Sequence, residues 1–215
     1  MKIGILGSGM VGQTLSAGFL KHGHQVMLGT RDSDKPNLQE WRHKNPAVQL
    51  GNFEQAAKFG ELAVLCTLGH AAVDVLRLAG PDNLAGKTII DTTNPLAGTP
   101  PVDGVIAYTT GPNQSLAEQI QAAVPRSHVV KAFNSVGNAR MVNPHYEQGT
   151  PTMFICGNNA DAKTQMSAIL QQFGWEAYDC GTITAARAIE PLCMLWCIPG
   201  FLHNQWGHAF KLFTH

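Results

Sequence analysis

The chain has 215 residues, of which 44% are hydrophobic and 14% charged, with 15 basic and 15 acidic side chains. A formal net charge of zero argues against nucleic acid or an anionic membrane as the main partner. Five scattered cysteines fit reduced thiols better than a disulfide framework, so we expect a cytoplasmic protein. The N-terminal apolar run is too short and glycine-broken for a signal peptide. Because no apolar stretch is long enough, we expect no membrane span.

Short apolar runs alternate with helical patterns along most of the chain. The predicted strands are Lys2–Leu6, Gln25–Gly29, Leu62–Thr67, Thr88–Asp91, His128–Phe133, Thr152–Cys156 and Trp175–Asp179. The predicted helices between them are Val11–Lys21, Ala71–Leu78, Leu116–Val124 and Asp161–Phe173. This alternation implies βαβ units. We therefore predict an α/β fold of the Rossmann type, with a doubly wound, mostly parallel sheet covered on both faces.

The pattern changes after residue 180. Thr184–Cys197 and Phe201–Phe213 both have helical patterns, and the breaker Pro199-Gly200 separates them. We expect a pair of helices, or one sharply bent helix, as a short C-terminal appendage. The expected division is a nucleotide-binding Rossmann domain over residues 1–180 and a helical segment over residues 181–215, which would contribute to an acceptor site, a dimer contact or both.

A glycine-rich turn follows the first predicted strand directly. The hexamer Gly7-Ser8-Gly9-Met10-Val11-Gly12 has the spacing of a dinucleotide-binding turn. In that motif Gly7 allows the tight turn, Gly9 the approach of the pyrophosphate and Gly12 the contact of helix with sheet. The following helix would offer free N–H groups to the phosphates. Glycine turns also occur as purely structural features, but the position between a strand and an amphipathic helix favours a dinucleotide.

The tip of the second predicted strand carries Thr30 and Arg31, where NAD enzymes usually place an acid that binds the ribose 2′-OH. These groups suit a 2′-phosphate: Thr30 can donate a hydrogen bond, Arg31 can bind bidentately, and Lys35 can add charge. Each charge-assisted bond contributes about 1.5–3 kcal/mol, roughly tenfold or more in affinity. Asp32 would lie near the ribose if the strand were longer, and Arg31 could simply be an exposed loop residue. The pattern predicts NADP(H).

Four stretches carry a resemblance to a known family: GILGSGMVGQTLSAGFLKHGHQVMLGTRD, VVKAFNSV, CGNNADAK and DCGTITAARAIEPL. In this order they resemble the coenzyme F420-dependent NADP oxidoreductases and the oxidoreductase domain of the STEAP metalloreductases. The first is shared with many Rossmann enzymes, whereas the second and fourth are narrower and nearer to the metalloreductases. The resemblance implies an NADPH-binding domain, a small C-terminal lobe, a homodimer and hydride transfer to a flavin-like ring. Metalloreductases also need a haem-bearing membrane domain, so the acceptor, whether F420, FMN or FAD, is not carried over.

Three loops that follow predicted strands carry polar groups suited to the nicotinamide end of a dinucleotide. Thr67-Leu68-Gly69-His70 could border the nicotinamide ribose, although His70 could equally be a capping or surface histidine. Asn94 precedes a proline and is equally consistent with a turn. By resemblance, Asn134 borders the nicotinamide. Lys131 lies inside a strand, and we interpret it as paired with a carboxylate rather than as catalytic.

No acid–base pair stands out near these loops. Carbonyl reduction generally needs a positioned proton donor, whereas hydride transfer between a nicotinamide and a flavin-type ring needs mainly alignment. We therefore predict an oxidoreductase that transfers hydride between NADP(H) and a flavin or deazaflavin, with no catalytic side chain assigned. One alternative is an NADPH-binding redox sensor without turnover. Another is a reductase of a small imine such as pyrroline-5-carboxylate, although that family generally has a longer helical dimerisation domain.

Two pairs of side chains in the C-terminal segment are interpreted as structural. Cys193 and Cys197 are four residues apart, but no clustered histidine or carboxylate completes a tetrahedral metal site, so we expect core cysteines and no metal. Arg187 and Glu190 lie one helical turn apart, and we expect them to form an ion pair with each other.

Overall fold

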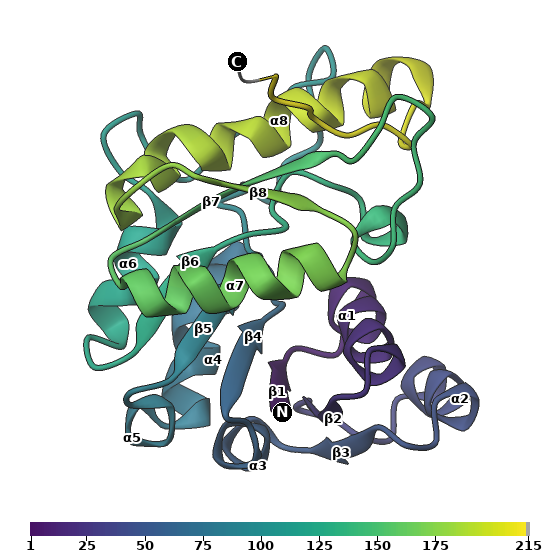
Figure 1. Ribbon diagram of the computed structural model, residues 1–215, viewed down its shortest axis with the longest axis vertical. Helices are drawn as coiled ribbons and strands as arrows, with labels where there is room; N and C mark the ends of the chain where they lie inside the picture. Colours follow the sequence, from purple (N-terminus) through teal and green to yellow (C-terminus); the bar gives the residue numbers. More distant parts are fainter. Residues whose placement is uncertain (214–215) are drawn as a thin grey trace.

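The computed structural model describes residues 1–213 as one mixed sheet with helices on both faces (Figure 1). The strands are β1 (Lys2–Leu6), β2 (Gln25–Gly29), β3 (Gln49–Gly51), β4 (Leu62–Leu65), β5 (Thr88–Asp91), β6 (His128–Lys131), β7 (Thr152–Gly157) and β8 (Glu176–Asp179). The α-helices are α1 (Met10–Lys21), α2 (Pro36–Lys44), α3 (Phe53–Phe59), α4 (Ala72–Ala79), α5 (Pro81–Leu84), α6 (Leu116–Ala123), α7 (Ala160–Gln172) and α8 (Ala186–His203). Short 3₁₀ helices are η1 (Gly69–Ala71), η2 (Asn138–Arg140) and η3 (Ile183–Ala185).

The sheet has eight strands in the order β3-β2-β1-β4-β5-β6-β7-β8. The strands from β3 to β6 are parallel, β7 is antiparallel to β6, and β8 is parallel to β7. This confirms the predicted Rossmann-type, mostly parallel sheet. The chain winds outward from β1 in both directions, so the switch point lies between β1 and β4, where open α/β sheets bind their ligands.

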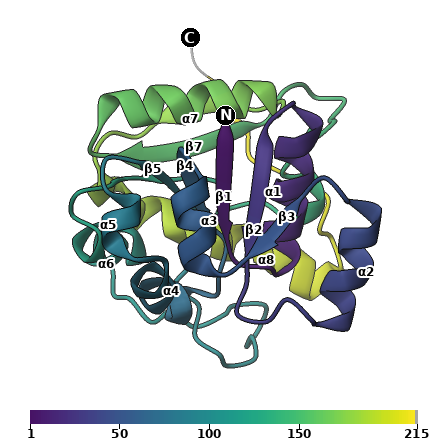
Figure 2. The same ribbon diagram turned by 90° about the horizontal axis from the view of Figure 1, so that it is seen from below.

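The hydrophobic core forms two layers because successive strand residues point to opposite faces of the sheet. Ile5 faces a layer that contains Leu15 and Phe19 of α1, together with residues of α2 and α7. The next residue, Leu6, faces the opposite layer, which α3, α4, α5 and α6 cover together with the start of α8. Figure 2 shows the two helical layers on either side of the strands. Between these two layers, the carboxyl ends of the parallel strands lie along one edge of the sheet.

All seven predicted strands are present, but the sequence patterns missed several short elements. Of α2, only Leu38 is buried, so this helix has no apolar stripe that would reveal it. β3 has three residues and none is fully buried. α3 is stabilised by a capping box in which Asn52 and Gln55 exchange side-chain and backbone hydrogen bonds. These elements depend on local capping or on tertiary contacts rather than on a long periodic pattern.

The predicted break at Pro199-Gly200 is wrong. α8 continues through this dipeptide and ends at Asn204, whose left-handed backbone (φ 54°) terminates the helix. The following residues do not form the predicted second helix, and the tail returns along the start of β7, where the Thr152 amide donates to the Phe210 carbonyl at 2.8 Å. Packing explains the glycine, because a side chain at Gly200 would lie 2.3 Å from the Trp206 ring. This glycine makes room for the indole rather than breaking the helix.

One described helix has the length and composition to cross a membrane. Ile183–His203, which comprises η3 and α8, spans 21 residues and contains an 18-residue window with a mean hydropathy of 1.3. Core helices of water-soluble proteins also meet these criteria, and 39% of the apolar window is buried inside the protein. Ala186, Ile189 and Glu190 form part of this buried surface, against the sheet layer that contains α6.

Candidate functional site

The glycine turn is closely packed at its first and third glycines and open at the second. Gly7 has a φ of +132°, and a side chain there would lie 2.2 Å from the carbonyl oxygen of Cys66. A side chain at Gly12 would lie 1.9 Å from the Gly7 carbonyl oxygen, so the protein itself requires both glycines. Gly9 differs, because a Cβ there would meet no atom within 4 Å. No side chain caps α1, which leaves its N-terminal N–H groups available for phosphate oxygens.

The Thr30 hydroxyl is engaged within the protein, and its bond to a 2′-phosphate stays a prediction. Its side chain is 4% exposed, and its hydroxyl accepts a hydrogen bond from the Ser8 hydroxyl at 2.9 Å. The same hydroxyl donates to the carbonyl oxygen of Asp32 at 3.0 Å. Since a hydroxyl has one proton, Thr30 has none left to donate to a phosphate in this arrangement. Thr30 instead joins the glycine turn to the loop after β2.

Arg31 and Lys35 are the candidate cations for a 2′-phosphate. Both are exposed, and neither has an ion pair or a side-chain hydrogen bond with any other residue of the described range 1–213. Asp32 forms no ion pair with either cation within residues 1–213, and its carboxylate accepts from the backbone amide of Asp34 at 2.9 Å. The loop after β2 therefore presents unpaired positive charge next to the glycine turn, which suits a phosphate dianion.

The loops after β4 and β5 lie against each other. A side chain at Gly69 would lie 2.1 Å from the carbonyl oxygen of Asn94, so glycine allows the two backbones to pack closely. The Thr67 hydroxyl is enclosed and has no hydrogen-bond partner among residues 1–213. Leu68 is 71% exposed, and His70 is also exposed, in η1. The structure thus brings together two of the three loops predicted to border a nicotinamide.

The third loop joins them through a pair of amide side chains. Asn94 donates from Nδ2 to the backbone oxygen of Asn134 at 2.9 Å. Asn134, 3% exposed, donates from Nδ2 to the Ile189 carbonyl at 2.9 Å and to Asn94 Oδ1 at 3.3 Å. Its Oδ1 has no partner in the described chain. The preceding Phe133 has a φ of +60°, a strained conformation that tends to occur at functional sites. Together with Thr67, Asn134 gives this end of the site enclosed acceptors that a ligand donor could satisfy.

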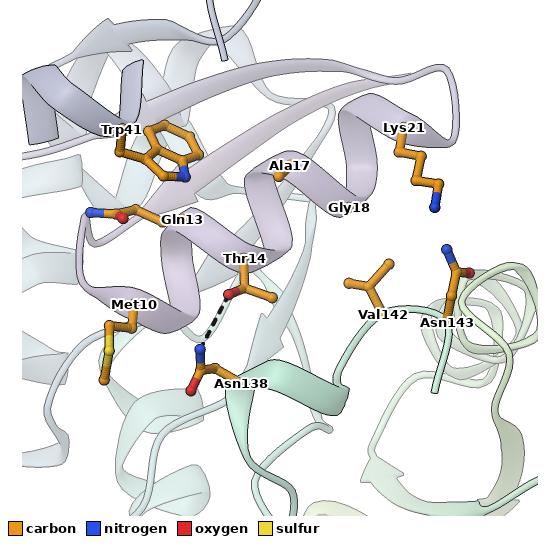
Figure 3. A pocket seen from close by; sticks show the side chains of 10 residues that line it. All are labelled: Met10, Gln13, Thr14, Ala17, Gly18, Lys21, Trp41, Asn138, Val142 and Asn143. Atoms are coloured by element: carbon orange, nitrogen blue, oxygen red, sulfur yellow. Dashed lines mark hydrogen bonds between the residues drawn. The ribbon is translucent and has the colours of Figure 1, made fainter. Parts of the chain in front are cut away.

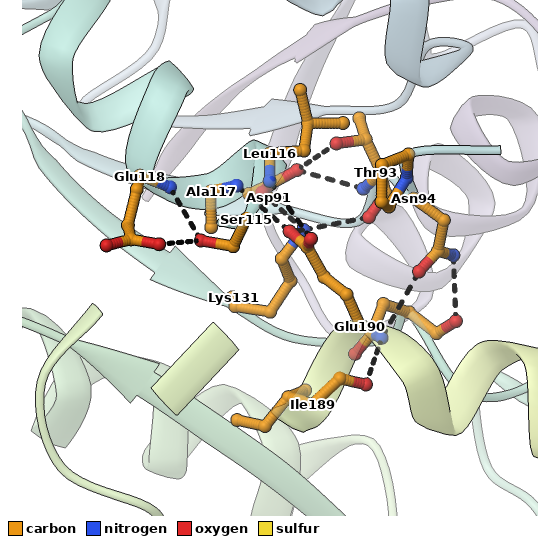
Figure 4. Close-up of polar contacts among 12 residues, drawn as sticks. Asp91, Thr93, Asn94, Ser115, Leu116, Ala117, Glu118, Lys131, Ile189 and Glu190 are labelled. Atoms are coloured by element: carbon orange, nitrogen blue, oxygen red, sulfur yellow. Dashed lines mark hydrogen bonds and ion pairs between the residues drawn. The ribbon is translucent and has the colours of Figure 1, made fainter. Parts of the chain in front are cut away.

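A buried ion cluster lies next to the amide pair (Figure 4). Lys131 Nζ is 2.6 Å from Asp91 Oδ2 and 3.0 Å from Glu190 Oε1. Glu190 also accepts the backbone amides of Leu116 and Ala117, at 3.0 and 2.9 Å, and so caps the N-terminus of α6. Burial lowers the pKa of Lys131, but the two carboxylates raise it more, and the net shift is upward. The ammonium is therefore charged and paired, which confirms the structural interpretation of Lys131.

The predicted ion pair between Arg187 and Glu190 is wrong. Arg187 instead binds Glu118 of α6 through two hydrogen bonds, from Nε at 2.9 Å and from Nη2 at 2.7 Å. Glu190 points into the core because it belongs to the buried side of α8, whereas Arg187 is exposed. The sequence analysis did not identify Asp91 and Glu190 as the partners of Lys131. The available signal was an acid within an otherwise apolar segment, which requires a buried partner.

The two cysteines of α8 are buried, as predicted for core cysteines. Cys193 and Cys197 form a small cluster with Trp196, and Phe210 of the tail packs against it. Among residues 1–213, no group of three or more histidines, cysteines or acids is arranged to hold a metal ion.

A cavity of about 550 Å³ lies between α1, Trp41 of α2 and the segment 138–143 that follows β6 (Figure 3). Gln13, Thr14 and Lys21 of α1 line it, with Trp41 of α2 and Asn138 on the opposite sides. Asn138 Nδ2 is 3.5 Å from Thr14 Oγ1 across this space. Met10 is the one predicted site residue among the lining residues. The cavity therefore adjoins the predicted site at the start of α1.

Comparison with known proteins identifies the family. A family model described as NADP oxidoreductase, coenzyme F420-dependent, matches residues 2–95. A candidate F420-dependent NADP reductase from Arthrobacter sp. FB24, known from its crystal structure, is 33% identical with a TM-score of 0.93, and the match covers 100% of both chains. The chain belongs to the coenzyme F420-dependent NADP oxidoreductase family.

Two curated relatives extend this result. The F420-dependent NADP reductase of Methanocaldococcus jannaschii is 27% identical over 205 residues, which cover 91% of this chain and 90% of that protein. Metalloreductase STEAP3 of Rattus norvegicus is 29% identical over 211 residues, which cover 94% of this chain and 39% of that protein. The chain thus spans about two-fifths of the length of that metalloreductase. As a member of the F420-dependent family, the chain is an NADP-dependent oxidoreductase.

Proposed function

We propose that this oxidoreductase transfers a hydride between NADP(H) and a flavin-type ring, with the deazaflavin F420 as the best-supported acceptor. The observation that carries the proposal is an open, uncapped glycine turn beside an unpaired arginine at the tip of β2. The relatives that are named as reductases of this cofactor pair support the same reading.

The pyrophosphate, the 2′-phosphate and the nicotinamide end of the dinucleotide each have groups suited to them. The N–H groups that begin α1 would bind the pyrophosphate over Gly9. Arg31 and Lys35 would bind the 2′-phosphate and give NADP its advantage over NAD. The enclosed acceptors of Thr67 and Asn134 would meet donors on the nicotinamide and its ribose.

The ionisable groups near the strand ends favour a ring acceptor over a carbonyl or an imine. The buried acids Asp91 and Glu190 are held by Lys131, so neither serves as a proton donor. In the three loops predicted to border the nicotinamide, His70 is the one ionisable side chain, and it is exposed. Bound NADPH would supply the hydride. The chain would bind the two rings and align them, which is the main requirement of such a transfer.

The test is oxidation of NADPH by the purified protein under anaerobic conditions, followed by loss of nicotinamide absorbance. Separate reactions contain F420, FMN, FAD, pyrroline-5-carboxylate or no acceptor. We expect turnover with F420 and little without an acceptor. Tight NADPH binding without turnover on any acceptor would refute hydride transfer and favour a redox-sensing module. Turnover confined to the imine would favour the imine reductase instead.

A further inference from the structure

Two backbone carbonyls fix the orientation of the amide pair between the loops after β5 and β6. A carbonyl oxygen only accepts hydrogen bonds, so the Asn134 atom 2.9 Å from the Ile189 oxygen must be Nδ2. The same reasoning applies to Asn94, whose Nδ2 lies 2.9 Å from the Asn134 backbone oxygen. Asn94 Oδ1 then faces Asn134 Nδ2, and Asn134 Oδ1 is left as a free acceptor. Helix α8 therefore determines which way the Asn134 amide points.

The ion cluster is one of the contacts that hold α8 in place. Glu190, the residue after Ile189, is bound to Lys131 of β6 and to the first two amides of α6. Lys131 lies three residues before Asn134 on the same strand and loop. Glu190 thus links the Ile189 carbonyl to β6. The loop after this strand carries Asn134, whose side-chain amide the Ile189 carbonyl orients. The side chains of Lys131 and Glu190 are 0% and 2% exposed, so water does not compete for these contacts.

We propose that Glu190 is a positioning residue for the nicotinamide half of NADP(H). It holds the Ile189 carbonyl at hydrogen-bonding distance from Asn134, and the Asn134 Oδ1 acceptor then binds a donor on the nicotinamide carboxamide or its ribose. This inference rests on the proposed NADP site. It goes beyond that site by assigning a role in cofactor geometry to a residue of the C-terminal helix, 56 positions after Asn134.

The test compares a whole cofactor with a fragment that lacks the nicotinamide. In Glu190→Gln the side chain keeps its size but loses the charge that binds Lys131. We expect NADPH to bind about three- to tenfold more weakly, corresponding to one lost or weakened hydrogen bond. The affinity for adenosine 2′,5′-bisphosphate should change less than about twofold, because this fragment contacts only the adenosine end of the site. The fluorescence of bound NADPH, which reports the surroundings of the nicotinamide, should shift toward that of free NADPH.

Arg187→Gln is the matched control. It removes the exposed contact between α8 and α6 one helical turn earlier, without touching the buried cluster. We expect this variant to bind both ligands as the wild type does. If Arg187→Gln and Glu190→Gln give the same loss of NADPH binding, general loosening of α8 explains the effect and the inference is wrong.

Asn134→Ala keeps the inference testable if Glu190→Gln does not fold. It leaves the ion cluster intact and should reproduce the selective loss of NADPH binding; an unchanged ratio of NADPH to fragment affinity would overturn the inference. In a variant that carries both Glu190→Gln and Asn134→Ala, the two losses of NADPH affinity should not add, since both act through the Asn134 amide. Additive losses would also count against the inference. If the wild type binds neither NADPH nor the fragment, the proposed function itself fails. Wild-type binding of both ligands with no selective loss in any variant refutes the positioning role alone.

Discussion

Replacing Arg31 by alanine should separate NADPH from NADH. The guanidinium is exposed and makes no ion pair within residues 1–213, so its loss removes no contact that holds the fold together. We expect a change in unfolding free energy within about 0.5 kcal/mol, as for ordinary surface substitutions. A charge-assisted hydrogen bond to phosphate contributes about 1.5–3 kcal/mol, and solvent exposure favours the lower figure. The expected result is about a tenfold rise in the Kd of NADPH and no change for NADH.

The assay is isothermal titration calorimetry of both nucleotides against wild type, Arg31→Ala and Arg42→Ala. Arg42 is the control because it is also exposed and unpaired among the described residues, but it lies on α2 away from the tip of β2. Its replacement makes the same change in net charge. The difference between Arg31→Ala and wild type should shrink at high salt, where exposed charges are screened. Equal weakening of NADPH and NADH, or equal effects of the two arginine variants, would refute the role assigned to Arg31.

Three further outcomes follow from the structure. Gly9→Ala should keep the melting temperature of the wild type yet weaken NADPH binding at least tenfold, because a Cβ at Gly9 meets no protein atom. Gly12→Ala should lower the melting temperature, because a Cβ at Gly12 would lie 1.9 Å from a protein atom. Equal melting temperatures for the two variants would contradict this. Lys131→Met should destabilise the fold by about 3–5 kcal/mol in urea, since two buried carboxylates lose their cation. Because the folded pKa of Lys131 is raised, its contribution should persist at neutral pH and disappear only as the pH rises above about 10; a contribution already lost between about pH 7 and 9 would count against the pairing. Burial raises the pKa of the Cys66 and Cys156 thiols to about 12, so alkylation at mildly alkaline pH, mapped by mass spectrometry, should modify both only after unfolding.

The glycine turn and the end of β2 could be located from the sequence because their signals are local. The spacing of Gly7, Gly9 and Gly12 reflects steric needs within a few residues of backbone, and the structure shows a close contact at the first and third and open space at the second. The position of Arg31 follows from the end of β2, which the apolar pattern located correctly. Neither inference needed knowledge of distant contacts.

Predictions failed where a residue depends on a distant partner. Pro199 and Gly200 have the composition of a helix break, but the Trp206 ring packs on the glycine and the helix continues. Arg187 and Glu190 have the spacing of an ion pair, yet α8 turns one toward solvent and the other into the core. Local rules describe what a segment can form, and packing between segments selects among those possibilities.

The sequence by itself determined the class of fold and located the glycine turn, and it predicted a preference for a phosphorylated dinucleotide, because each depends on periodicity or on neighbouring residues. Only the tertiary structure joined Asp91, Lys131 and Glu190, which come from β5, β6 and α8 and are as far as 99 positions apart. Charges buried at such separations must pair, since isolated charges in the core are too costly. Which residues pair is decided by how the sheet places its strand ends and how α8 crosses them.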